Sequence, residues 1–196
     1  ILTQMTEHGQ SFEDALRDAQ QLGYAEANPT ADVEGYDAMY KLSILSSMSF
    51  HAHMPIEVIY REGITKLTKA DFETAQLLNY RIKLLAIGKK DGNKIEVRVH
   101  PTMIPKTHPL ASVRGVFNAI FLTGHAVDDI MLYGRGAGCM PTASAVVSDI
   151  VYACHHDKQH NYMTFFHEER MSSEIVHVKD YHRIECLRLH VSDNTG

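Results

Sequence analysis

Residues 22–42 read LGYAEANPTADVEGYDAMYKL, and the rest of the chain is organised around this stretch. Pro29 and Gly35 punctuate its first part, which predicts a turn-rich loop with room for a ligand to approach the backbone. The apolar run that follows predicts a long helix over about residues 33–50. Because apolar residues occur nearly all round this helix, we expect it to be central and buried.

The same stretch carries a concentration of ionisable side chains. Asp37 and Lys41 are four residues apart with the acid first, which is the favourable order for an ion pair on a helix. A lysine within an apolar helix is expected to be paired or to have a lowered pKa, and both prepare it for proton transfer. With the carboxylates of Glu26 and Asp32 nearby, the pattern indicates a pocket for a small ligand that bears an ammonium group. The alternative is a solvated loop with a surface ion pair worth about 0.3–0.5 kcal/mol.

The order of the expected elements predicts the fold class. Helices come first, four strands follow, and a further helix comes after them, which is typical of an α+β fold with helices packed on one face of a mostly antiparallel sheet. Expected helices cover residues 2–8, 12–22, 33–50, 69–78 and 142–155, and expected strands cover residues 57–60, 80–89, 94–103, 116–122, 126–133 and 183–191, with a hairpin turn at Asp91-Gly92.

Composition narrows the class of protein. The net charge of −5 argues against a surface for nucleic acid or for an anionic membrane. No apolar run approaches the roughly 18 residues that span a bilayer. Cys139, Cys154 and Cys186 match neither a zinc site nor a disulfide framework, so reduced thiols in a cytoplasmic protein are the simplest interpretation.

Two further patterns in the sequence are candidate sites. Gly134-x-Gly136-Ala137-Gly138, between a strand and a helix, favours close backbone approach by an anion, although its spacing is not the dinucleotide fingerprint. A tight strand-to-helix connection is the alternative. The thirteen histidines show no zinc-binding pattern, so we predict surface histidines and no metal site, with a His-rich metal-binding protein as the opposing hypothesis.

Residues 23–42, with the pattern GYAExxPTxDVxGxDAxxKL, closely resemble the catalytic signature of homoserine dehydrogenases. Further stretches resemble that family in the same order. They are Ile1-Leu2-Thr3, Tyr60-Arg61-Glu62-Gly63-Ile64, residues 134–150 (GRGAGxxPTASAVVxDI), and residues 185–196, which are similar to the first strand of an ACT regulatory domain.

The resemblance implies reversible reduction of L-aspartate 4-semialdehyde to L-homoserine with NADP or NAD as cofactor. It implies that Lys41 transfers the proton and that Asp37 orients Lys41 or binds the reacting hydroxyl group. Glu26 and Asp32 would hold the ammonium group of the substrate, with Tyr24 as a lesser pocket residue. Gly136 and Gly138 would contact the cofactor. Asn28 departs from the family pattern, in which aspartate is usual at this position.

The resemblance also implies a domain plan. Residues 1–157 would form a catalytic and dimerisation domain, residues 158–184 a polar linker, and residues 185–196 the beginning of the ACT domain. The chain is then expected to be a piece of a longer protein whose N-terminal part binds the dinucleotide and, as the family allows, a monovalent cation. A homodimer through residues 116–133 is implied, and a non-catalytic binding or oligomerisation module is the alternative.

Overall fold

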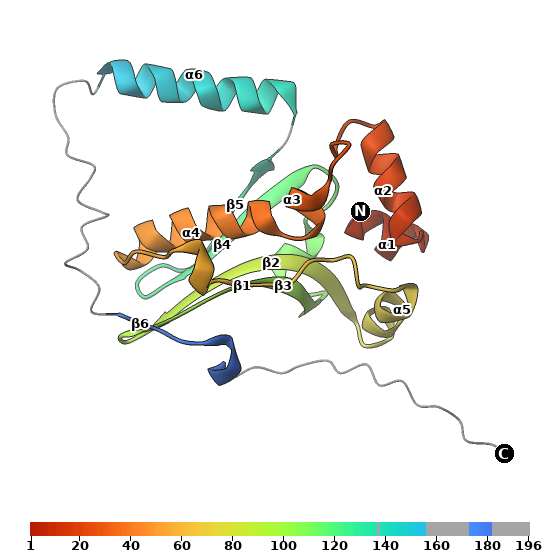
Figure 1. Cartoon of the computed structure of the whole chain (residues 1–196), viewed down its shortest axis with the longest axis horizontal. Helices are drawn as coiled ribbons and strands as arrows, with labels where there is room; N and C mark the ends of the chain where they lie inside the picture. The colour runs from red at the N-terminus through yellow and green to blue at the C-terminus, as the bar shows by residue number, and fades with distance from the viewer. Residues whose placement is uncertain (137, 156–172, 182–196) are drawn as a thin grey trace.

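The computed structural model describes residues 1–136, 138–155 and 173–181 (Figure 1). Six α-helices and six strands alternate with short 3₁₀ turns in this part of the chain. The elements in order are α1 (Leu2–His8), α2 (Phe12–Gln21), α3 (Thr30–Val33), α4 (Tyr36–Phe50), η1 (Ile56–Val58), β1 (Tyr60–Arg61), α5 (Lys69–Leu77), β2 (Tyr80–Asp91), β3 (Lys94–Pro105), η2 (Pro109–Ser112), β4 (Phe117–Gly124), β5 (Asp128–Arg135), α6 (Cys139–His155), β6 (Glu174–Ile175) and η5 (Val178–Asp180).

A four-stranded sheet forms the centre of the fold. Strands β2 and β3 make a long antiparallel hairpin in which Asp91 pairs with Lys94, so the two-residue turn is Gly92-Asn93 and lies one residue beyond the predicted Asp91-Gly92. The short strands β1 and β6 both run parallel to β3. The predicted α+β class is therefore confirmed, but the central sheet is mixed, because short segments from elsewhere in the chain join β3 in the parallel sense.

Two clusters of buried side chains attach helices to this sheet. Helix α4 lies over the sheet and packs Met39 and Leu42 against β3, whose Ile95, Val97 and Val99 have no exposed surface (Figure 1). Helices α1, α2 and α5 gather at the end of the hairpin away from its turn, where they enclose a second cluster. That cluster comprises Met5, Ala15, Phe72, Ala75 and Ile82.

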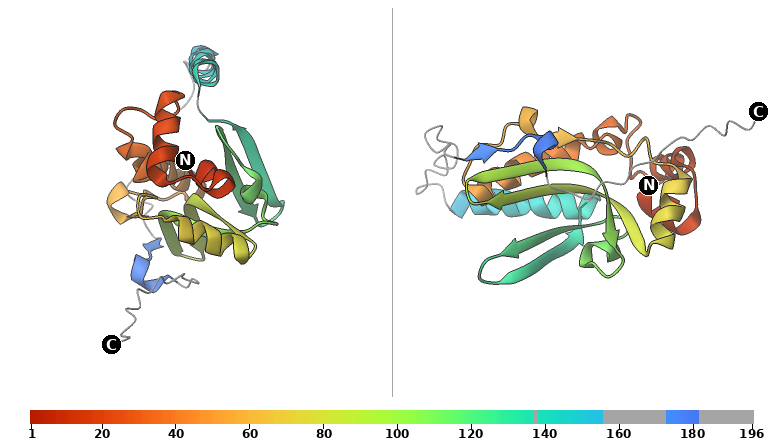
Figure 2. Two further views of the ribbon diagram at one scale, coloured as in Figure 1. Left: turned by 90° about the vertical axis from the view of Figure 1, so that its right-hand side faces the viewer. Right: turned by 90° about the horizontal axis from the view of Figure 1, so that it is seen from below.

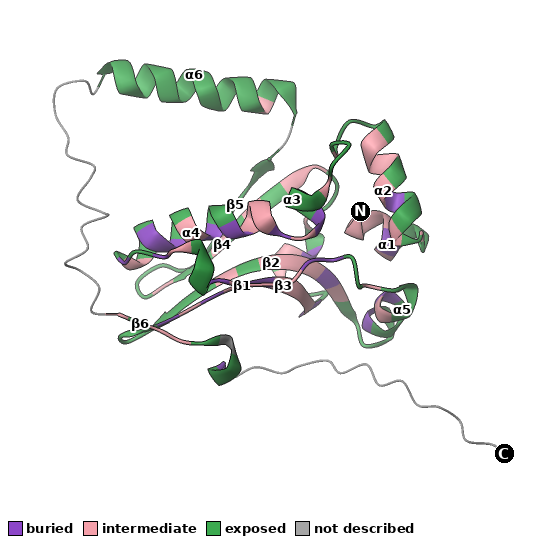
Figure 3. Ribbon diagram, in the orientation of Figure 1, coloured by how far each residue is buried: buried purple, intermediate pink, exposed green. Residues whose placement is uncertain are grey.

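Strands β4 and β5 form a separate antiparallel hairpin, and α6 stands away from the main body (Figure 2). No residue of α6 is buried within the described part of the chain, and Figure 3 shows the helix exposed except for one intermediate position near its start. Large apolar side chains of the hairpin are also exposed, namely Ile120, Leu122, Val127, Ile130, Leu132 and Tyr133. Both elements thus present apolar surface that the described residues do not cover.

Short-range capping contacts define several helix ends. Ser11 accepts a hydrogen bond from the Asp14 amide at the start of α2, as a capping residue does. Thr68 and Asp71 form a capping box at the start of α5, and Asn79 after its end has a φ of 63°. These boundaries depend on contacts within four residues, which the sequence itself displays.

The prediction for the central helix was wrong in two respects. Gly35, with a φ of 77°, separates α3 from α4, so there is no single helix from residue 33. In addition, α4 buries only the side that faces the sheet, while Ile44 is 58% and Met48 50% exposed (Figure 3). The cause is that the sheet covers one side of α4 and no described residues cover the other.

Two other segments differ from expectation. The strand predicted at residues 57–60 is mainly the 3₁₀ turn η1, and only Tyr60 and Arg61 pair with β3. Residues 173–181, predicted as linker, supply β6 and the buried Tyr181, whose hydroxyl donates to the Val97 carbonyl at 3.1 Å. The strand predicted at residues 183–191 lies outside the described residues. None of the described helices has both the length and the apolar character needed to cross a membrane.

Candidate functional site

The loop between α2 and α3 is held by its own side chains. The Gln20 amide donates to the carbonyl of Glu26 at 3.0 Å and to that of Ala27 at 3.4 Å. The Asn28 side-chain oxygen accepts from the Thr30 amide at 3.2 Å and from the Thr30 hydroxyl at 2.6 Å. Asn28 therefore caps this turn with its side-chain oxygen, as an aspartate would, but without the negative charge.

Arg61 of β1 clamps the corner between α3 and α4. Its guanidinium donates to the Glu34 carbonyl and lies 3.6 Å from the Glu34 carboxylate. The same group stacks over the Tyr36 ring, with 3.8 Å between the guanidinium carbon and the ring centre. Because Glu34 and Tyr36 flank Gly35, Arg61 contacts both sides of the turn from which α4 begins.

Gly63 brings the next residues of the same motif against this corner. The Ile64 amide donates to the Val33 carbonyl at 2.8 Å, and the Glu62 amide donates to the Val99 carbonyl at 2.8 Å. A methyl group added to Gly63 would lie 2.6 Å from the Val33 carbonyl oxygen. Residues 60–64 thus support α3 and the start of α4. The sequence marks these residues as a motif, but their supporting role becomes visible only in the structure.

Removing the Arg61 clamp should loosen this corner. Arg61→Ala is expected to lower the free energy of unfolding by about 1–2 kcal/mol, since a partly buried cation–π contact and a charge-assisted hydrogen bond are lost together. Urea denaturation measures the loss, and hydrogen exchange should quicken at the first amides of α4. Arg17→Ala is the control, because Arg17 forms only an exposed ion pair with Asp14. Equal stability of the two variants would contradict the clamp.

The predicted pair on α4 is present, although not buried. The Lys41 ammonium lies 2.7 Å from the Asp37 carboxylate, as the four-residue spacing predicted. The Lys41 side chain is 62% exposed and that of Asp37 is 48% exposed, so the described residues alone do not enclose the pair. The reason is that the pair lies off the side of α4 that meets the sheet.

The other predicted substrate residues lie on the elements that lead up to this pair. Glu26 and Tyr24 belong to the loop after α2, and Asp32 belongs to α3. All three residues are exposed. The Arg61 clamp and Gly63 hold α3 against the start of α4, so Asp32 and Asp37 are presented from two joined helices. Among the five predicted residues, the Asp37–Lys41 pair is the one side-chain contact that the described part of the chain shows.

The glycine-rich segment before α6 divides into two parts. The Gly136 amide donates to the Val116 carbonyl at 3.4 Å, and a methyl group on Gly136 would lie 1.5 Å from the Asn118 side-chain nitrogen. Gly138 has a φ of 121°, and an added methyl group there would meet nothing closer than 3.5 Å. Gly136 is therefore packed closely against the Asn118 side chain of β4, whereas Gly138 leaves accessible backbone at the start of α6.

Metal-binding groups do not gather in the described residues, where no cluster of three or more His, Cys, Asp or Glu side chains could hold an ion. Cys139 and Cys154 are exposed free thiols on α6. Cys186 lies outside the described residues. No metal ligand is therefore identified within residues 1–136, 138–155 and 173–181.

Comparison with families of known proteins finds one matching model, described as homoserine dehydrogenase, over residues 1–151. A homoserine dehydrogenase of Bacillus subtilis is 40% identical over all 196 residues, which is 45% of that protein. One from Neisseria gonorrhoeae is 50% identical over 151 residues, which cover 77% of this chain and 35% of that protein. The chain thus spans less than half the length of these relatives.

Solved structures give the same likeness. A homoserine dehydrogenase from Thiobacillus denitrificans superposes with a TM-score of 0.81 at 45% identity, covering 90% of this chain and 42% of that one. A hyperthermophilic archaeal homoserine dehydrogenase mutant in complex with NADPH superposes with a TM-score of 0.62 at 32% identity, covering 82% of this chain and 44% of that one.

Proposed function

Because the chain belongs to the homoserine dehydrogenase family, we propose that it forms the substrate-binding and catalytic part of an enzyme that reversibly reduces L-aspartate 4-semialdehyde to L-homoserine. The observation that carries this proposal is the Asp37–Lys41 pair, which an acidic loop and α3 directly precede. An aldehyde reduction needs a proton donor at the carbonyl oxygen, and this substrate also needs anionic groups around its ammonium.

Lys41 is the proton donor in this proposal. As the aldehyde carbon accepts a hydride and its C=O π bond breaks, the Lys41 ammonium transfers a proton to the developing alkoxide oxygen, which yields the hydroxyl of homoserine. In the reverse direction the neutral Lys41 amine takes that proton back. Asp37, whose carboxylate lies 2.7 Å from the Lys41 ammonium, pairs with it and orients it toward the substrate.

Glu26 and Asp32 bind the substrate ammonium group, and Tyr24 borders the same surface. Charge-assisted contacts of this kind are strongest where water is excluded. The five residues are all open to solvent in the described part of the chain. We therefore propose that a further layer of protein covers the acidic loop in the working enzyme and completes the pocket.

The cofactor in this proposal is NADPH or NADH, in agreement with the NADPH complex of the archaeal homologue. When bound, it supplies the hydride. Gly138 and the first amides of α6 are the backbone groups that fit a contact with it, because they are accessible and helix N-termini favour anions. Gly136 is the less suitable of the two predicted glycines, since its amide already donates to Val116. Most of the dinucleotide, and any monovalent cation, would be bound outside these 196 residues.

The domain plan is proposed with one revision. Residues 1–157 form the catalytic and dimerisation domain, and residues 173–181 belong with it because β6 and Tyr181 join its sheet. The linker predicted over the rest of residues 158–184 and the regulatory domain predicted to begin at residues 185–196 fall outside the described residues. The exposed apolar side chains of β4 and β5 favour a homo-oligomer of a cytoplasmic enzyme. The same surface is what supports the alternative of a non-catalytic oligomerisation module.

A kinetic comparison tests the proposed function. In the complete protein that contains these residues, we expect NADPH oxidation with aspartate semialdehyde, and Glu26→Gln should raise KM about tenfold with a smaller change in kcat. The reason is that a charge-assisted contact to the bound ammonium, worth roughly 1.4 kcal/mol, is lost. Glu13→Gln, an exposed change on α2, is the matched control.

Two results would refute the assignment. An inactive wild type would favour the oligomerisation module. An active enzyme with the same KM in both glutamate variants would show that the acidic loop does not bind substrate.

A further inference from the structure

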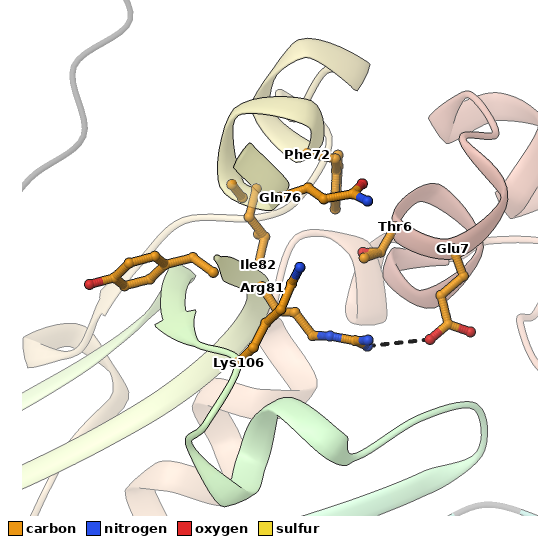
Figure 4. Close-up of a pocket in the computed structure, with 9 residues that line it drawn as sticks. Thr6, Glu7, Phe72, Gln76, Arg81, Ile82 and Lys106 are labelled. Atoms are coloured by element: carbon orange, nitrogen blue, oxygen red, sulfur yellow. Dashed lines mark hydrogen bonds and ion pairs between the residues drawn. The ribbon is translucent and has the colours of Figure 1, made fainter. Parts of the chain in front are cut away.

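A cavity of about 280 Å³ lies between α1, α5 and the start of β2, away from the acidic loop (Figure 4). Phe72, Ala75 and Ile82 supply apolar surface on one side, and each is at most 5% exposed. Gln76 extends from the same helix as Phe72, and Lys106 points toward this space from the opposite side. An apolar wall beside a few convergent polar groups is the usual form of a small-molecule site.

Positive charge exceeds negative charge at this cavity. The Glu7 carboxylate forms ion pairs with Arg81 at 3.3 Å and with Arg114 at 3.0 Å, so two guanidinium groups share one carboxylate. Lys83 lies beside them and donates to the Val113 carbonyl. Burial lowers the pKa of the Lys83 ammonium, and the charges of Arg81 and Arg114 lower it further, against the opposing effect of Glu7.

Lys106 adds a further cation at the mouth of the cavity. Its ammonium has no ion-pair partner among the residues that the structure describes. Of the charged residues that line the cavity, Arg81 and Lys106 are cations and Glu7 is the anion, in a chain whose net charge is −5. A net positive charge at one cavity of an acidic chain is a local feature, and a bound anion would neutralise it.

We propose that this cavity binds a small organic anion with a short apolar tail, its carboxylate or phosphate group held by Lys106 and Arg81. The tail would lie against Phe72, Ala75 and Ile82. Gln76 lines the same space and its amide can donate to the anionic group. The site is separate from the acidic loop, which suits a cation, so the two surfaces select ligands of opposite charge.

Binding of defined probes to the complete protein tests this proposal. The probes are isovalerate, inorganic phosphate and isovaleramide, with sodium chloride at matched ionic strength, and binding is followed by calorimetry and by the shift in thermal midpoint. We expect isovalerate or phosphate to raise the midpoint above the chloride reference. Isovaleramide has the same tail without the charge and should bind at least tenfold more weakly than isovalerate.

The cations are tested with a pair of matched variants. Lys106→Gln should weaken binding of the anion by about tenfold or more, whereas Lys89→Gln, an exposed change at the far end of β2, should leave it unaltered. Binding of phosphate alone, or of isovalerate alone, identifies the anionic group. Absence of binding by both anions, equal binding of isovaleramide, or equal affinity in the two lysine variants would overturn the proposal, and none of these results depends on enzyme turnover.

Discussion

Replacing Lys41 with alanine is expected to lower kcat for aspartate semialdehyde reduction by a factor on the order of 10²–10⁴ in the complete protein. The physical reason is that the developing alkoxide then has no positioned proton donor and must take its proton from water. KM should change little, because Glu26 and Asp32, rather than Lys41, hold the ammonium group in the proposed mechanism. Steady-state kinetics with NADPH would measure both quantities.

Lys69→Ala is a closely matched control for this variant. Lys69 and Glu73 form an ion pair four residues apart on α5, and the Lys69 side chain is 66% exposed against 62% for Lys41. Exposed pairs of this kind contribute less than about 1 kcal/mol, so both variants should fold with similar stability. Turnover by Lys41→Ala within threefold of the control would mean that another group supplies the proton and that Lys41 is only a surface ion-pair partner.

Gly63→Ala is expected to cost about 2–3 kcal/mol of stability, the largest effect on folding among the proposed variants. The added methyl group would lie 2.6 Å from the Val33 carbonyl oxygen and 2.7 Å from the Glu34 α-carbon. Both contacts are with backbone, which cannot move aside by a simple change of side-chain rotamer. Urea denaturation would measure the loss in free energy of unfolding.

The consequence of this substitution reaches the proposed active site. Moving Val33 and Glu34 displaces the turn at Gly35 from which α4 begins, so the Asp37–Lys41 pair should shift relative to Asp32. Gly134→Ala is the control for stability, because a methyl group there meets nothing within 4 Å and should change the free energy of unfolding by less than about 0.5 kcal/mol. A Gly63→Ala protein as stable as this control would show that the corner is not tightly packed.

The sequence by itself determined the features that depend on neighbouring residues. Helix ends at Ser11, Thr68 and Asn79 follow from local capping groups, and the Asp37–Lys41 ion pair follows from helical spacing. The long β2–β3 hairpin follows from its alternation and its turn residues. Each of these interactions closes over a few residues, so a linear pattern contains nearly all the information required.

Only the tertiary structure decided which side chains are covered and which distant segments meet. The parallel pairing of β1 and β6 with β3, and the clamp of Arg61 on Glu34, join residues far apart in the chain. The exposure of Lys41 likewise depends on which distant segments pack against α4. A run of apolar residues shows that a helix has surface to bury, but burial is a property of the neighbours that actually pack against it, and here the sheet covers one side of α4.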